Sequence, residues 1–173
     1  MADDYVRRTA ITRLSVDDEQ RELLEETISE WKRGCQLAMD MAWGKCNAKS
    51  DVQPLAYDDV REETDLGSQH AILATHQAAQ AITGCLERRS NGKQVSKPTF
   101  TAPTVTYDTR TMTLFDDDTV SLSTTESRVR CDLALPDAED GYQRQYLDSD
   151  NWSVTESNSP SVNGLSRRSG MRY

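Results

Sequence analysis

The chain has 173 residues, of which 36% are hydrophobic, enough for one compact domain or two small ones. It has no apolar run near the roughly 20 residues that a membrane-spanning helix needs, and no apolar signal core at its start, so we expect a cytoplasmic protein. The net charge of −9 argues at first sight against a nucleic-acid partner. However, Asp supplies 18 of the 29 acids and Lys only 5 of the 20 bases, a composition typical of salt-adapted proteins. In molar salt a nucleic-acid binder must rely on hydrogen bonds, stacking and shape, because counterion release contributes little.

The segment from Tyr5 to Val16 predicts a β-strand, because apolar and polar side chains alternate along it. Arg7 and Arg13 fall on one face, Arg8 lies nearby, and the segment has no acid. Two interpretations stay open. The arginines either solvate an edge strand and block aggregation, or they face the phosphates of a nucleic acid.

The clearest element is a helix from about Asp17 to Lys45. Residues 15–18 fit a capping box with Ser15 as the cap, and acids crowd the first turn. Trp31 lies on the apolar stripe, so we expect it in the core and not as a base-stacking platform. The whole stripe recurs at three- and four-residue steps and is predicted to be buried: Leu24, Ile28, Trp31, Cys35, Ala38 and Ala42.

Residues 47–53 are polar and predict a loop, and a short helix is expected around residues 57–64. A second long helix begins at Ser68 as its N-cap, carries Arg88 and Arg89 in its last turn, and stops at Asn91-Gly92. A short connector with Lys93 and Lys97 follows. The predicted apolar face of this helix consists of Ile72, His76, Ala79, Ile82 or Thr83, and Leu86.

After Phe100 the pattern alternates with period two. It predicts short strands at residues 105–107, 112–114, 120–122 and 128–135, with turns at 108–110 and 116–118. The three consecutive Asp residues at 116–118 are interpreted as a solvated hairpin tip, because the spaced ligands and the Gly of a calcium loop are absent. In the last strand the inward side chains are Val129, Cys131, Leu133 and Leu135.

These elements predict an α+β fold, a small antiparallel, wedge-like β-barrel or sheet with an inserted bundle of about three helices. Residues 1–16 form its first strand, 17–92 the helical insertion, 93–157 the rest of the β domain, and 158–173 a tail. One more strand starts near Asn151. The tail is expected to be disordered or aberrant, because Ser161 to Tyr173 has three arginines and no acid in an acidic chain. Readthrough in a wrong frame explains this shift, with a basic tail made for nucleic acid as the alternative.

No catalytic or metal-binding constellation stands out in the sequence. His70 and His76 are six residues apart and do not share a helix face, and His76 is predicted as a hydrogen-bonded core histidine. We therefore predict no catalytic residue, no metal site and no cofactor. The cysteines occur singly, without a C-x-x-C pair, which indicates reduced, partly buried thiols: Cys35, Cys46, Cys85 and Cys131.

The order of the elements resembles the N-terminal portion of the TnpB (OrfB) proteins of insertion sequences, specifically their haloarchaeal branch. The resemblance covers about residues 5 to 157. It rests on the basic strand from Val6 to Leu14, the two long helices, the connector GKQVSKPTF (Gly92 to Phe100) and the strand phrase VTYDTRTMTLFDDDTVSLST. The family usually has further basic residues after this connector, whereas this chain has Thr101-Ala102-Pro103.

The resemblance implies a transposase-associated family of RNA-guided DNA endonucleases, in which this region holds the guide RNA and the guide–target duplex. Cleavage belongs to a following RuvC-like domain that uses divalent metal and carries a cysteine zinc motif. The chain is therefore expected to be truncated before the nuclease half, with no enzyme activity or cofactor of its own. The expected partners are RNA and, second, DNA. Their backbones would be contacted by Arg7, Arg8, Arg13, Arg88, Arg89, Lys93 and Lys97.

Other function classes stay open. One is an inactive remnant or regulator that folds, binds RNA weakly and cuts nothing. Another is an acidic protein-interaction module with no role in nucleic-acid binding. An enzyme in its own right would need a constellation of converging catalytic groups, and the sequence shows none above background.

Overall fold

The computed structural model describes residues 7–135, 141–147, 153–160 and 167–172. The chain divides into two compact units, and each is described by itself. The β unit comprises Met1–Glu25 and Thr104–Tyr173, and the helical unit comprises Glu26–Pro103. Helices and antiparallel strands together confirm the predicted α+β class.

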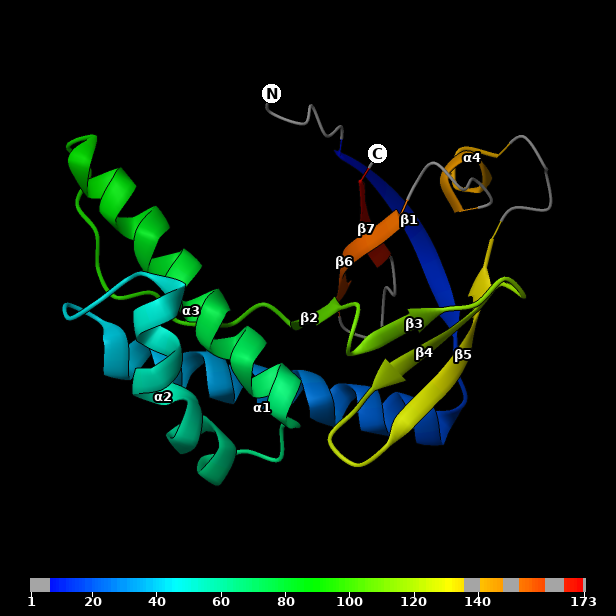
Figure 1. Cartoon of the computed structure of the whole chain (residues 1–173), viewed down its shortest axis with the longest axis horizontal. Coiled ribbons are helices and arrows are strands. Elements are labelled where there is room, and N and C mark those ends of the chain that lie inside the picture. Colours follow the sequence, from blue (N-terminus) through cyan, green and yellow to red (C-terminus); the bar gives the residue numbers. More distant parts are fainter. Residues whose placement is uncertain (1–6, 136–140, 148–152, 161–166, 173) are drawn as a thin grey trace. The chain divides into compact units, whose positions relative to one another are not determined.

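The helical unit is built from α1 (Asp18–Ala42, which starts in the β unit), α2 (Lys49–Glu63) and α3 (Ser68–Ser90) (Figure 1). The predicted stripe of α1 is confirmed, because all six of its side chains are buried. The other helices and their connecting loop approach α1 closely at Gly34, in the middle of the helix. A Cβ atom built there would lie 2.9 Å from Leu66 Cδ1, 3.2 Å from Val60 Cγ1 and 3.5 Å from Ala74 Cβ.

The start of α2 differs from the prediction. The helix begins at Lys49, so the expectation that residues 47–53 are all loop is wrong for Lys49–Gln53. Pro54 lies inside the helix near its N-terminus, where the missing N–H removes a single bond. Val52 is buried together with the other buried residues of α2. This burial stabilises the extra turn, although the polar sequence of the turn favours a loop.

The buried face of α3 also differs from the predicted one, which is wrong at several positions. Leu86 is 42% exposed, and Ile72 and His76 are only half-buried. The prediction placed the large apolar residues of α3 on the buried face. Close packing between helices instead favours small residues there. The residues that α3 does bury are His70, Ala71, Ala74, Thr75, Ala78, Ala79 and Ile82.

Two helix ends show how local sequence sets the boundaries. The capping box at the start of α1 is formed by Asp17 and Gln20, so the prediction that Ser15 is the cap is wrong. Gln20 N donates to Asp17 Oδ1 over 2.8 Å, and Asp17 N donates to Gln20 Oε1 over 3.2 Å. The predicted stop of α3 is confirmed, because Gly92 has a φ of +75° directly after the C-cap Asn91. At its start the N-cap is Gly67, and Ser68 is the first helical residue.

The β unit contains one antiparallel sheet with the strand order β2-β6-β7-β1-β5-β4-β3. Its strands confirm the predicted ones at residues 105–107, 112–114, 120–122 and 128–135, and β5 buries Val129, Cys131 and Leu133 as expected. The strands run over these bounds: β1 (Arg7–Ser15), β2 (Thr104–Asp108), β3 (Met112–Leu114), β4 (Thr119–Ser123), β5 (Arg128–Ala134), β6 (Ser153–Pro160) and β7 (Arg167–Arg172).

The sheet cannot be flat. Its two edge strands, β2 and β3, follow each other in the chain and are joined by only Thr109–Thr111, which can span at most about 14 Å. In a flat sheet of seven strands the edges would lie roughly 29 Å apart. The sheet therefore curls toward a barrel. β1 takes part in both halves, because Arg7–Thr12 pair with β7 and Arg13–Ser15 pair with β5.

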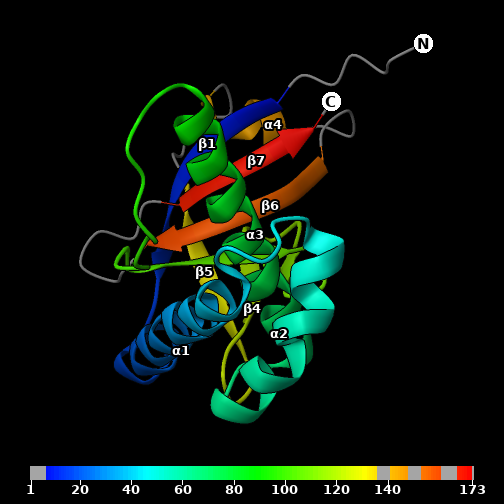
Figure 2. The same ribbon diagram turned by 90° about the vertical axis from the view of Figure 1, so that its left-hand side faces the viewer.

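The last part of the chain contains two differences from the sequence prediction. Arg167–Arg172 forms β7, which pairs with β1 and with β6 (Figure 2), so the expectation of a disordered tail is wrong for these residues. Backbone pairing along a strand edge does not need the hydrophobic alternation that this segment lacks. The short helix α4 (Arg144–Leu147) was not predicted. Residues 161–166 and 173 of the expected tail lie outside the described residues.

The unit boundaries differ from the predicted segment boundaries at 16/17 and 92/93. The first turns of α1 group with the β unit, where Gln20 Nε2 donates to the carbonyl of Arg130 over 2.9 Å. The connector groups with the helical unit, because it is bonded to α1. None of the described helices has both the length and the apolarity needed to cross a membrane. The prediction of unpaired thiols is confirmed, since all four cysteines are free.

We predict that Gly34→Val lowers the free energy of unfolding by at least about 2 kcal/mol, because the new side chain would overlap Leu66 and Val60. The matched control is Gly84→Ala in α3, where a Cβ meets nothing within 4 Å. It should gain about 0.5–1 kcal/mol from helix propensity. Denaturant unfolding followed by circular dichroism measures both. A Gly34→Val variant as stable as the parent would contradict the assigned close packing.

Candidate nucleic-acid interface

Charge is distributed unequally between the two units. The β unit contains nineteen acids and eleven bases, so it carries about −8 of the net −9. The helical unit contains ten acids and nine bases, and it holds all five lysines of the chain. Within the helical unit most acids lie between Asp51 and Asp65, on and just after α2. The segments 41–50 and 66–103 hold six bases and a single acid, Glu87.

The last turn of α3 gathers three of the predicted site residues. The helix ends in a Schellman arrangement, in which Lys93 N donates to the carbonyl of Arg88 over 3.1 Å and Gly92 N donates to that of Arg89 over 3.0 Å. This bond brings Lys93 back beside Arg88. All three cations are exposed, and no carboxylate pairs with any of them among the described residues. The positive charge also suits the negative end of the helix dipole.

The loop between α1 and α2 brings two further lysines to this end of the helical unit. Asn47 Nδ2 donates to Thr83 Oγ1 over 3.3 Å, and the Thr83 hydroxyl lies 3.3 Å from the Asn47 carbonyl. Lys45 and Lys49 flank Asn47 and are exposed. Arg88 follows Thr83 by five residues, or about 7.5 Å along the helix axis. We call this set the basic end: Lys45, Lys49, Arg88, Arg89 and Lys93.

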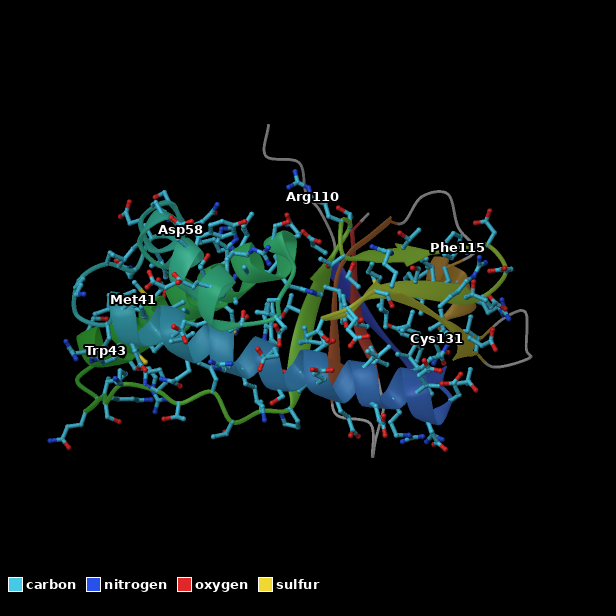
Figure 3. All side chains as sticks on the ribbon, turned by 90° about the horizontal axis from the view of Figure 1, so that it is seen from below. Met41, Trp43, Asp58, Arg110, Phe115 and Cys131 are labelled. Atoms are coloured by element: carbon cyan, nitrogen blue, oxygen red, sulfur yellow. The ribbon has the colours of Figure 1, made fainter. Side chains whose placement is uncertain are left out.

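Sequence reasoning missed Lys45 and Lys49. The sequence did contain a signal for them. Residues 41–50 hold two of the five lysines of the chain and no acid, which indicates a basic segment. They were taken as the end of one helix and part of a loop, because nothing in the sequence shows that this loop packs on α3. Figure 3 labels Met41 and Trp43 near the end of α1, just before the loop departs.

The connector is fastened to α1 by a short hydrogen-bond chain. Lys97 Nζ lies 2.8 Å from Asp40 Oδ1, and Gln36 Nε2 donates to the same oxygen over 2.9 Å. Gln36 Oε1 in turn accepts from Phe100 N over 3.1 Å. The hydrogen bond from Lys97 is the largest cause that holds the pKa of Asp40 below its ordinary value. Lys97, a predicted site residue, is thus already engaged with a carboxylate.

The remaining predicted site residues lie on β1. Arg7 pairs in register with Arg172 and Arg8 with Met171, so a second arginine comes opposite the first at the end of β1. The side chains of Arg7 and Arg8 lie outside the described residues. Arg13 is exposed, between the buried Thr12 and Leu14, and its register partner is Ala134. The predicted residues therefore fall into two sets, one in each unit.

Two arginines on the outer face of β5 are held by the sheet itself. Arg128 uses all five guanidinium N–H groups, because it donates to Ser121 Oγ and O, Ser123 Oγ, Thr113 Oγ1 and the Arg110 carbonyl, at 2.9 to 3.2 Å. It thereby ties β5 to β4 and to both ends of the turn into β3. This role was not predicted from the sequence.

Arg130 stacks on the aromatic ring that follows β3. Its Cζ atom lies 4.1 Å from the ring centroid of Phe115, and its Nη2 donates to Asp117 Oδ2 over 2.7 Å. Figure 3 labels Phe115 and Arg110 at opposite ends of β3. A hydrogen bond from Thr119 is the largest cause that lowers the pKa of Asp117.

Two of the three acids at 116–118, Asp117 and Asp118, are engaged with protein cations. Asp118 accepts two hydrogen bonds from Arg144, at 3.0 and 2.7 Å, and its φ of 61° places it in the left-handed region, which Asp tolerates in a turn. Among the described residues, no group of three or more His, Cys, Asp and Glu side chains is placed to hold a metal ion. The acids brace the β3–β4 turn against β5 and α4.

The two histidines differ in burial. His76 is half-buried, with its Nε2 atom 2.9 Å from Gln53 Oε1, and burial is the main cause that lowers its pKa. His70 is the buried one, at 2% exposure, and its ring meets Trp31 edge-on with centroids 6.1 Å apart. The prediction that His76 is a hydrogen-bonded residue holds, but its placement in the core is wrong. Trp31 lies in the core as expected, so it offers no stacking platform.

Comparisons with known proteins add no identification. No model of a protein family matches this sequence, and a search of curated proteins found no similar one.

We predict that Arg128→Lys lowers the free energy of unfolding by about 1 kcal/mol, because an ammonium with three donors cannot reach five acceptors on β4, on β3 and in the turn before β3. Arg88→Lys is the charge-conserving control at an exposed site and should leave stability unchanged. Urea unfolding at fixed salt compares the two variants. Equal stability for both would show that the Arg128 bonds add nothing.

Proposed function

We propose that this protein binds RNA, and that the basic end of the helical unit is the surface that contacts it. One observation carries the proposal. In a chain with a net charge of −9, five exposed cations gather at one end of three helices, and Glu87 is the only acid in the segments that supply them. Such a surface suits the closely spaced negative charges of a phosphate backbone.

The shape of this region also suits a nucleic acid. The last turns of α3 extend beyond α2 in both views of the chain (Figures 1 and 2), and every residue from Leu86 to Gln94 is exposed. A projecting helix end with mobile lysine and arginine side chains can follow a backbone without reading the base sequence. Recognition of this kind depends on shape and on phosphate spacing, as for an A-form duplex.

The resemblance to TnpB-type proteins supplies the class of RNA. It makes the ligand a guide RNA, or a guide RNA paired with DNA, and makes this chain the nucleic-acid-binding part of that family's machinery. On this proposal Arg7, Arg8 and Arg13 of the β unit supply further backbone contacts. The order of strand, long helices, connector and short strands supports it.

We assign no strand cleavage to the residues of this chain. Incubation of the purified chain with its co-purified RNA, matching DNA and Mg²⁺ should leave the DNA intact over hours. Cleavage above the level of a mock purification would contradict this part of the proposal.

A direct test is to express the tagged chain in a high-salt host, purify it at high salt and sequence the RNA that accompanies it. Enrichment of one RNA species over the total RNA of the host supports the proposal. A folded protein without any enriched RNA contradicts it, and the identification of protein partners then becomes the appropriate experiment.

We predict that Arg88→Gln/Arg89→Gln weakens RNA binding about tenfold at 0.2 M KCl, because two backbone contacts are lost. The slope of log K against log salt should become shallower by about 1.5. The control is Ser29→Glu/Ser68→Glu, which lowers the net charge of the helical unit equally at exposed positions away from the basic end. Fluorescence anisotropy with labelled RNA measures both, and equal weakening by the two variants would show only a net-charge effect.

The β unit favours a second candidate function. Its nineteen acids against eleven bases make it a poor surface for phosphates and a suitable one for a basic protein partner. An acidic interaction module predicts a protein, and no RNA, in the same purification. The two candidates are thus distinguished by one experiment.

A further inference from the structure

The helical unit contains an open groove that none of the predicted site residues explains. It has a volume of about 330 Å³, within the range of small-ligand sites. One wall is the face of α1 from Lys32 to Asp40, and the other is the end of the connector at Thr99 and Phe100. The lining residues are Lys32, Arg33, Gln36, Leu37, Asp40, Thr99 and Phe100.

The two walls are held at a fixed separation. The bond from Phe100 N to Gln36 Oε1 fixes the backbone next to the aromatic ring, and the Lys97–Asp40 pair fixes the connector three residues earlier. Gln36 Nε2 joins these two contacts through Asp40 Oδ1. Because the connector is anchored twice, the groove exists before any ligand arrives, which lowers the entropy cost of binding.

The chemistry of the lining combines an apolar slot with positive charge. Phe100 and Leu37 supply apolar surface, and Thr99 supplies a hydroxyl group at the rim. The charge of Asp40 is offset by Lys97, and Arg33 lies 3.7 Å from Glu30 and 3.6 Å from Glu63. Lys32 has no carboxylate within ion-pair distance among the described residues. A ligand with a flat apolar part and an anionic part fits this combination.

We propose that the groove binds one unstacked nucleotide of a single-stranded RNA, with its base against Phe100 and Leu37 and its phosphate at Lys32. The inference rests on the proposed function and deepens it. Bases that leave the stack are commonly held on aromatic side chains, and this contact tolerates any sequence. The connector leads from Lys93 of the basic end to Phe100 in seven residues, at most about 25 Å, so a single strand can contact both.

The groove also supplies the kind of contact that high salt leaves intact. Backbone contacts at the basic end weaken as salt rises, because counterion release contributes less. Stacking of a base on a ring depends on apolar and dispersion contacts, which salt does not screen. The two protein sites that contact one RNA, the basic end and the groove, therefore differ in how their binding responds to salt. This difference makes the proposal testable.

The test measures binding of a labelled twelve-nucleotide oligouridine to the full chain at 0.2 M and 2 M KCl. Phe100→Leu should weaken binding about tenfold at both concentrations, because it keeps apolar volume and removes the stacking face. Phe100→Tyr should bind within twofold of the parent. Lys32→Gln should weaken binding at 0.2 M KCl, and its effect should shrink at 2 M. The control is Phe115→Leu, at the only other phenylalanine, which lies in the β unit and should have no effect.

The outcomes separate this inference from the proposed function. If the parent binds oligouridine and Phe100→Leu binds equally well, the groove assignment is overturned while RNA binding stands. Equal losses from Phe100→Leu and Phe115→Leu overturn it too. If the parent binds neither oligouridine nor its co-purified RNA, both proposals fail. Should Phe100→Leu fail to fold by circular dichroism, 4-thiouridine crosslinking of the parent decides: a crosslink at residues 94–110 supports the groove, and crosslinks exclusively elsewhere overturn it.

Discussion

The close approach of α2, α3 and the loop between them to Gly34 is the constraint on which the helical unit depends. A Cβ atom at this position would lie 2.9 Å from Leu66 Cδ1, so a larger residue would require Leu66 to shift away from α1. The same closeness explains why α3 buries mostly alanines, since two helices with small facing side chains approach more tightly. Beyond the alanine face, Thr83 still bonds to Asn47, and the turns from Leu86 onward are exposed. They extend outward and carry the arginines and the connector lysine with them.

Charge is separated along the chain in a way that net charge alone conceals. A value of −9 suggests a surface that repels phosphate, yet almost all of that excess belongs to the β unit. Acids in the helical unit concentrate on and just after α2, and one of them, Glu63, lies by Arg33, as does Glu30 of α1. The cations of the basic end lack such partners among the described residues. High net charge opposes association between molecules in salt, and on the proposed function the basic end is the part of the chain that contacts the RNA.

The sequence predicted most of the fold because long periodic patterns leave little choice. The stripe of α1, the alternation in β5 and the Asn91-Gly92 stop each follow from local rules. The errors occurred where packing outweighs local preference: α3 buries small residues, and Lys49–Gln53 is helical although its composition favours a loop. Strand β7 forms because the backbones of β1 and β6 offer hydrogen-bonding groups on either side of it. The sequence of β7 itself does not predict a strand. Only part of the candidate site could be predicted from the sequence, because local rules do not show which distant segments come together. Arg88, Arg89 and Lys93 are close in sequence, whereas Lys45, Lys49 and the Lys32–Phe100 groove depend on contacts between distant segments.

The connector joins the basic end to the groove beside Phe100, and one ion pair holds it to α1 between them. Lys97 lies 2.8 Å from Asp40, so the carboxylate occupies the position that a phosphate oxygen would take beside this lysine. That contact is exposed, which makes it individually weak and sensitive to salt. The hydrogen bond that Phe100 N donates to Gln36 Oε1 is part-buried and does not involve a charged partner, so it persists when salt weakens the ion pair. On the proposed function, a connector anchored in this way would release Lys97 to the RNA while the groove beside Phe100 keeps its shape. Electrostatic capture and stacking would then be carried by separate residues of one short segment.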